Sequence, residues 1–150
     1  MEVPLRIVVD ADACPAKNII ISVAKEQNLE VIMICDTSHV INDGYSTVIT
    51  VDKGADSADF KIAAVTKKND IVITQDYGVA AMVLGKKCYA LRPDGFIYTD
   101  FNIDSLLFAR HVAKKVRKGG GKLSNPSKRT KEDDINFENS LRKLVNMYGE

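Results

Sequence analysis

The stretch Leu5-Arg-Ile-Val-Val-Asp-Ala-Asp-Ala-Cys-Pro15 decides the fold of this 150-residue chain. Its first half, Leu5–Val9, is a short apolar run rich in β-branched residues, which is typical of a buried strand. Pro15 then opens an apolar pattern with helical spacing that continues to about Gln27. The stretch therefore predicts a strand, a loop and a helix, in that order.

The same alternation of apolar strands and helices continues as far as residue 91. The predicted strands are Glu30–Cys35, Tyr45–Val51, Asp70–Thr74 and Lys87–Leu91, and the predicted helices between them are Ala55–Lys68 and Tyr77–Leu84. The turn sequence Arg92-Pro-Asp-Gly95 ends the last of these strands. Because parallel strands need helical crossovers, this order predicts a three-layer α/β/α fold with a mostly parallel central sheet.

Residues 101–150 are expected to form a C-terminal helical extension of the core, residues 1–100, within one domain that spans 1–150. Ile103–Val116 predicts an amphipathic helix, which Gly119-Gly-Gly121 interrupts. Thr130-x-x-Asp133 resembles a capping box that starts a last helix. The buried face of that helix is predicted to carry Phe137, Leu141, Leu144 and Tyr148. We expect a mobile basic loop between the two helices.

The charges are unevenly distributed, although 21 Lys and Arg against 20 Asp and Glu leave a net charge of only +1. Residues 110–131 hold nine basic side chains and no acidic one. Eight of them, called the basic stripe below, are candidate nucleic-acid contacts: Arg110, Lys114, Lys115, Arg117, Lys118, Lys122, Lys128 and Arg129. The alternative is a solvated basic face that keeps the protein soluble.

The three cysteines, Cys14, Cys35 and Cys88, have neither the number of a disulfide framework nor the spacing of a zinc site. Cys14 precedes a predicted helix, but we expect a small buried cysteine there and not a nucleophile. No apolar run approaches the roughly 20 residues of a membrane helix. These features predict a cytoplasmic protein without membrane contact, and they leave a homo-oligomer open.

Aspartates follow nearly every predicted strand. Asp10 and Asp12 follow the first strand, Asp36 the second, Asp52 the third and Asp76 the fourth, while Asp56 and Asp59 begin the helix after the third strand. The carboxyl ends of parallel strands share one edge of a sheet, where ligands bind. Crowded carboxylates repel one another unless a cation neutralises them, which predicts Mg²⁺ or Mn²⁺. Single members could instead be helix caps or loop residues, which is the favoured interpretation for Asp36 and Asp52.

Four runs in this order resemble the bacterial YaiI/YqxD family, an uncharacterised group with a PIN-like domain. They are Val9-Asp-Ala-Asp-Ala-Cys-Pro15, Gly54-Ala-Asp-Ser-Ala-Asp59, Asp70-Ile-Val-Ile-Thr-Gln-Asp76 and Leu91-Arg-Pro-Asp-Gly95. PIN domains are ribonuclease folds that cut single strands with Mg²⁺ or Mn²⁺ bound to acids. The resemblance implies that Asp10, Asp59 and Asp76 bind the metal. It departs at Asp133-Asp134, where Asp-Arg is expected before the last helix.

The predicted function is a metal-dependent nuclease acting on RNA or single-stranded nucleic acid. In this prediction Asp10, Asp59 and Asp76 hold the ion, and Asp12 or Asp56 orients the ion or its water. One alternative is a module that binds nucleic acid or protein without cutting. A further alternative is a haloacid-dehalogenase-type phosphatase, with Asp10 as nucleophile and Asp12 as general acid and base.

Overall fold

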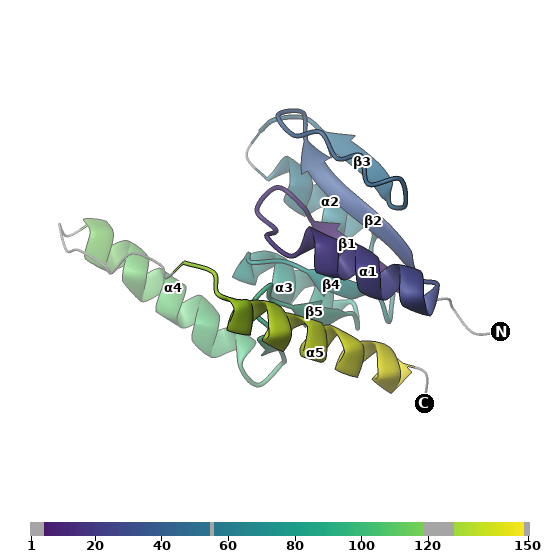
Figure 1. Ribbon diagram of the computed structural model, residues 1–150. Helices are drawn as coiled ribbons and strands as arrows, with labels where there is room; N and C mark the ends of the chain where they lie inside the picture. Colours follow the sequence, from purple (N-terminus) through teal and green to yellow (C-terminus); the bar gives the residue numbers. More distant parts are fainter. Residues whose placement is uncertain (1–4, 55, 119–127, 149–150) are drawn as a thin grey trace.

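A twisted sheet of six strands forms the centre of the protein (Figure 1). The computed structural model describes residues 5–54, 56–118 and 128–148, without the side chains of residues 117, 118 and 148. The strands are β1 (Arg6–Asp10), β2 (Glu30–Asp36), β3 (Thr47–Val51), β4 (Ile71–Ile73), β5 (Tyr89–Leu91) and β6 (Ile97–Tyr98), in the order β3-β2-β1-β4-β5-β6. Only β6 runs antiparallel to its neighbour among these strands, which confirms the predicted mostly parallel sheet.

Helices cover both faces of the sheet, as Figure 1 shows. They are α1 (Lys17–Gln27), α2 (Ser57–Val65), α3 (Tyr77–Gly85), α4 (Ile103–Lys118) and α5 (Lys131–Tyr148). Alternate residues of β1 face opposite layers, because strand side chains alternate between the two faces. Val9 packs in the core that α1 and α5 cover, whereas Val8 packs in the core that α2 and α3 cover. The three-layer α/β/α architecture follows.

Four predicted elements are shorter in the structure, among them the predicted strands Asp70–Thr74 and Lys87–Leu91, which are β4 and β5, and one strand was not predicted. The predicted helix Ala55–Lys68 is α2, which ends at Val65 because Thr66 adopts an extended backbone. The predicted strand Tyr45–Val51 begins only at Thr47, because the Asp43 carboxylate holds the two preceding N–H groups in a turn. The two-residue strand β6 follows the predicted turn and is too short to give a periodic pattern.

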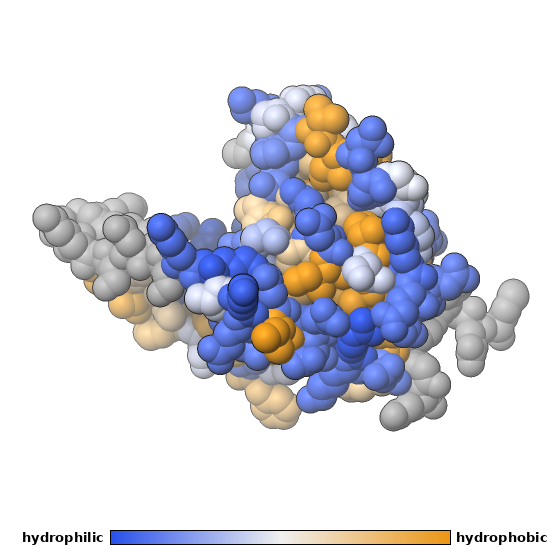
Figure 2. Space-filling view, viewed as in Figure 1, coloured by the Kyte–Doolittle hydropathy of each residue, from blue (hydrophilic) through white to orange (hydrophobic). Residues whose placement is uncertain are grey.

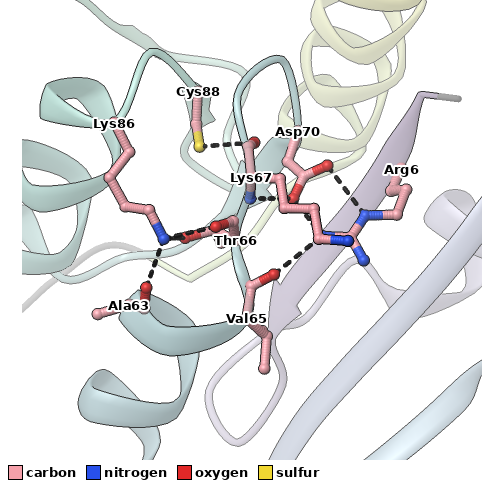
Figure 3. A network of polar contacts seen from close by, with 8 residues as sticks. All are labelled: Arg6, Ala63, Val65, Thr66, Lys67, Asp70, Lys86 and Cys88. Carbon is pink, nitrogen blue, oxygen red and sulfur yellow. Dashed lines mark hydrogen bonds and ion pairs between the residues drawn. The ribbon is translucent and has the colours of Figure 1, made fainter. Parts of the chain in front are cut away.

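Asp70 forms an ion pair with Arg6 at the amino ends of β1 and β4 (Figure 3). The Asp70 carboxylate, 1% exposed, accepts from Arg6 Nη2 at 2.6 Å and from Arg6 Nε at 3.1 Å. It also accepts from the Lys67 N–H at 2.7 Å, and Arg6 donates to the Val65 carbonyl at 2.9 Å. Every oxygen of Asp70 is therefore used in joining the end of α2 to the sheet. Asp70 is a structural residue at the opposite end of the strands from Asp10 and Asp76.

The last helix of the C-terminal extension begins as its capping residues predict. The Thr130 N–H donates to Asp133 Oδ2 at 2.9 Å, and the Asp133 N–H donates to Thr130 Oγ1 at 3.2 Å, which confirms the capping box of α5. Phe137, Leu141 and Leu144 are buried as predicted. The predicted basic loop with Gly119-Gly-Gly121 and the side chain of Tyr148 lie outside the described residues. None of the described helices is long and apolar enough to cross a membrane.

Candidate functional site

The two central strands bring the first predicted site residues together. Asp10 ends β1, Thr74 follows β4, and the register pairs Val9 with Ile73. Thr74 Oγ1 donates to Asp10 Oδ2 at 3.0 Å and accepts from the Asp76 N–H at 3.0 Å. Thr74 is buried and was not among the predicted site residues. It orients the Asp10 carboxyl and connects it to the segment that carries Asp76.

Burial and neighbouring charges change the acidity of two carboxyls at this sheet edge. Burial is the main reason that the pKa of Asp10 rises to about 6, and the charges of Asp59, Asp76 and Asp12 add to the rise. Burial also raises the pKa of Asp59, with further contributions from Asp76 and Asp56. Asp10, Asp59 and Asp76, called the acid cluster below, thus repel one another. A bound cation would relieve this repulsion.

Asp76 also caps a helix, so it has a structural role in addition to its predicted role as a metal ligand. Its Oδ1 accepts from the N–H groups of Gly78 at 2.8 Å and Val79 at 3.2 Å, at the start of α3. The same oxygen lies 3.5 Å from Arg110 Nη1 on α4. Because these contacts all use Oδ1, Oδ2 is the oxygen through which Asp76 would bind an ion. Arg110 places a basic-stripe residue at the edge of the acid cluster.

Asp12 belongs to a second group of titratable side chains. Its two carboxylate oxygens accept from the Asp36 N–H at 3.1 and 3.0 Å, and Asp12 Oδ1 lies 2.9 Å from His39 Nδ1. His39 Nδ1 also lies 3.3 Å from Asp36 Oδ1. Hydrogen bonds from Ser38 lower the pKa of Asp36, and His39 lowers it further. These contacts hold the loop after β1 against the end of β2.

The Asp12, Asp36 and His39 group differs from the acid cluster in spacing and chemistry. One ligand atom from each of its residues lies within 4.8 Å of the others, and no other such trio occurs in the described part of the chain. An imidazole with two carboxylates suits Mn²⁺ or Zn²⁺, whereas the oxygen-only acid cluster suits Mg²⁺ or Mn²⁺. The sequence prediction missed His39, although it follows a strand end by three residues, as Asp76 does.

A pocket of about 290 Å³ opens beside Asp10 and Asp76. Its other walls are Ala13, Cys14, Gln75 and Pro93. Asp12 does not line it, so the two aspartates of the first loop face different surroundings. Burial raises the pKa of the Cys14 thiol, which keeps it protonated at neutral pH. Cys14 is the predicted small buried cysteine.

The remaining two aspartates lie at the periphery. Asp56 is exposed, precedes α2 in a left-handed conformation with φ of 67°, and makes no side-chain capping bond. It acts on the acid cluster only through its charge, which raises the pKa of Asp59. Asp52 is exposed after β3. The charges of Asp59 and Asp76 therefore act on Asp10, but these three carboxylates do not have the 4.8 Å spacing of the Asp12, Asp36 and His39 group; Asp56 and Asp52 are exposed.

Sequence comparison adds a family to this geometry. The profile of the YaiI/YqxD family, described as uncharacterized, matches residues 8–147. The chain belongs to this family. A UPF0178 protein of Clostridium kluyveri is 53% identical over 141 residues, 94% of this chain and 93% of its own length. A UPF0178 protein of Ruminiclostridium cellulolyticum is 56% identical over 137 residues, 91% of this chain and 90% of its own length. No solved structure matches the chain significantly.

In this YaiI/YqxD family member the basic stripe divides between two elements. Arg110, Lys114 and Lys115 are exposed on α4, which projects away from the sheet in Figure 1. Figure 2 shows a largely hydrophilic surface over α1 and the start of α5, in which hydrophobic residues form separate patches. Lys128 is exposed before α5. The side chains of Arg117 and Lys118, and the whole of Lys122, lie outside the described residues.

Arg129 donates hydrogen bonds to two groups within the protein. Its Nη1 donates to the Pro93 carbonyl at 2.7 Å, and its Nε donates to Asp134 Oδ1 at 2.8 Å. These bonds join the start of α5 to the turn after β5. Asp134 replaces the arginine expected at this place from the family resemblance, and the structure gives it the role of partner to Arg129. A contact of Arg129 with phosphate would require these bonds to break.

Proposed function

We propose that this protein is a nuclease with a PIN-like fold that cuts RNA or single-stranded nucleic acid and requires Mg²⁺ or Mn²⁺. The observation that carries the proposal is the acid cluster at the carboxyl ends of the sheet. Asp10 and Asp76 come from neighbouring parallel strands and Asp59 from the helix beside them. Three repelling carboxylates, one with a pKa of about 6, favour a site in which a cation is bound.

The donor set suits a hard divalent cation. Asp10, Asp59 and Asp76 would hold it through carboxylate oxygens, with Asp76 using Oδ2 because Oδ1 caps α3. When bound, such an ion activates water and stabilises the leaving oxygen of a phosphodiester. Thr74 keeps Asp10 oriented toward the ion through its 3.0 Å hydrogen bond. The cluster thus needs no histidine or cysteine for this chemistry.

The basic residues of α4 would hold the negatively charged backbone next to the acids. Arg110 Nη1 lies 3.5 Å from Asp76, so its guanidinium could contact a phosphate that is bound beside the acid cluster. Lys114 and Lys115 continue the positive charge along the exposed part of α4. Arginine and lysine contacts to phosphate give affinity without reading sequence. This arrangement supports a substrate that is recognised mainly through its backbone.

The proposal is tested by incubating a labelled single-stranded RNA and a labelled single-stranded DNA with the protein and Mn²⁺. We expect cleavage that a chelator abolishes. Asp59→Asn should reduce the rate at least about a hundredfold, because it removes a metal ligand without removing a helix cap. Asp52→Asn is the matched control, since Asp52 is exposed and lies outside the cluster. Its rate should equal that of the wild type.

Other outcomes would favour the two alternatives. Retention of the oligonucleotide without products, with or without Mn²⁺, would support a non-catalytic binding module and contradict the nuclease. Release of phosphate from a phosphomonoester with a covalent intermediate at Asp10 would support a phosphatase. The geometry gives the phosphatase less support, because the Asp12 carboxylate is bound to Asp36 and His39 and does not line the pocket beside Asp10.

A further inference from the structure

A second and larger cavity adjoins the acid pocket. Its volume is about 490 Å³, within the range of small-molecule sites, and it shares Gln75 and Pro93 with the smaller pocket beside Asp10 and Asp76. Its walls include Pro15, Tyr77, Arg92 and Asp94. A molecule that spans both cavities would therefore have one part next to the acid cluster and another part among these side chains.

The walls of the larger cavity are held in place by hydrogen bonds. Arg92 donates to Asp94 through Nε and Nη2, both at 2.9 Å, and its Nη1 lies 3.3 Å from the Tyr77 hydroxyl. The Tyr77 ring packs edge-on against the buried Tyr98 ring, with centroids 5.9 Å apart. Arg129, which also lines the cavity, donates to the Pro93 carbonyl at 2.7 Å. The cavity is thus formed before any ligand binds.

The charges of the cavity exclude a simple phosphate site. The two arginines in its wall each have an aspartate partner: Arg92 pairs with Asp94 at 2.9 Å, and Arg129 pairs with Asp134 at 2.8 Å. Paired guanidiniums attract a second anion weakly. What the walls offer instead is the Tyr77 ring and the planar Arg92 guanidinium, one face of which packs against the Phe96 ring, together with amide and carboxylate groups. Unstacked bases are bound in this way, by stacking on planar groups and by hydrogen bonds along their edges.

We propose that this cavity binds one nucleobase of the substrate, on the nucleotide whose phosphate lies at the acid cluster. The inference rests on the proposed function and adds a base-binding subsite to it. Gln75 lines both cavities and its Nε2 donates to the Ala13 carbonyl at 2.5 Å, so a nucleotide that spans the two cavities would lie against its side chain. A base can enter the cavity only when it is unpaired and unstacked. The subsite therefore gives a structural reason for a preference for single strands.

The test compares the affinities of nucleoside 5′-monophosphates and of ribose 5-phosphate for the intact protein with Mn²⁺, measured by calorimetry. At least one nucleotide should bind about tenfold more tightly than ribose 5-phosphate, which is the lower part of the stacking contribution measured per base. Gln75→Ala and Tyr77→Leu should each reduce this difference to less than about threefold. Tyr77→Leu should leave the affinity for ribose 5-phosphate unchanged, because Tyr77 lines only the larger cavity. Gln75 lines both cavities, so Gln75→Ala is judged by the ratio of the two affinities.

Matched controls separate the base-binding subsite from folding defects. Gln27→Ala, at an exposed position of α1, should leave the preference for nucleotides unchanged. Tyr77→Phe keeps the ring and should retain most of the preference, even if Tyr77→Leu disturbs the packing against Tyr98. Equal affinities for nucleotides and ribose 5-phosphate would overturn the subsite while cleavage of oligonucleotides still supports the nuclease. If no phosphate compound binds and no oligonucleotide is cut, the subsite and the proposed function are both wrong.

Discussion

Asp10→Asn should stabilise the protein in the absence of metal. The exchange removes a charge that is buried and lies near three other aspartates, but Asn retains an oxygen that can accept the hydrogen bond from Thr74. Like charges and burial both oppose ionisation of Asp10, which is why its pKa rises from 3.8 to about 6. The substitution therefore removes an unfavourable contribution to the free energy of folding.

The magnitude follows from the linkage between protonation and folding. A carboxyl with a raised pKa in the folded state binds its proton more tightly there, so stability is highest below pH 3.8 and falls as the pH rises to about 6. At about 1.4 kcal/mol per pKa unit, the loss at pH 7 is about 3 kcal/mol. For a chain of this size that corresponds to an increase in Tm of about 6 to 12 °C for Asp10→Asn.

The assay is thermal unfolding followed by circular dichroism, in a chelator, at several pH values from 4 to 8. The difference in Tm between Asp10→Asn and wild type should grow between pH 4 and pH 6 and then stay constant. Added Mn²⁺ should stabilise the wild type but not the variant. Asp52→Asn is the control at an exposed position and should follow the wild type. An Asp10→Asn protein that melts lower than wild type and still responds fully to Mn²⁺ would refute the reasoning.

Three further variants test other parts of the structure. Asp70→Asn leaves a charged arginine without its partner and should lower the free energy of unfolding by about 3 kcal/mol in urea denaturation; a loss below about 1 kcal/mol would contradict the role of the ion pair. Arg110→Gln removes a positive charge that lies next to Asp76 and should increase the Mn²⁺ affinity about two- to fivefold in calorimetry. A decrease would contradict the idea that Arg110 and Mn²⁺ compete for Asp76. Changing Lys114, Lys115 and Arg117 to Gln should flatten the slope of log K for oligonucleotide binding against log salt by about 0.7 per lost contact. An unchanged slope in fluorescence anisotropy would show that these residues form a solvated surface without phosphate contacts.

The fold could be predicted from the sequence because its strands are continuous apolar runs buried on both faces. Val8 and Val9 pack into different cores, so neither position tolerates a polar residue, and the pattern is visible without a structure. The ends of elements were less predictable. The end of α2 depends on the extended backbone of Thr66 and on a bond from the Lys67 N–H to Asp70, neither of which gives a periodic pattern.

The acid cluster could be predicted for a related reason, because parallel strands place their carboxyl ends at one edge. The convergence of Asp10 and Asp76 follows from sheet order alone. Asp12 could not be assigned in this way, since its carboxylate turns toward the next strand and contacts Asp36 and His39. The direction of a loop side chain depends on tertiary contacts, which sequence spacing does not contain.

The proposed metal site can be observed in a crystal structure of the protein with Mn²⁺, with data collected for the anomalous signal of manganese. We expect a peak bonded to carboxylate oxygens of Asp10, Asp59 and Asp76, with Asp76 contributing Oδ2. The same data should show the Arg110 guanidinium withdrawn from its 3.5 Å contact with Asp76. A peak only at Asp12, Asp36 and His39, or no peak in a crystal saturated with Mn²⁺, would contradict the central claim that the acid cluster is the metal site.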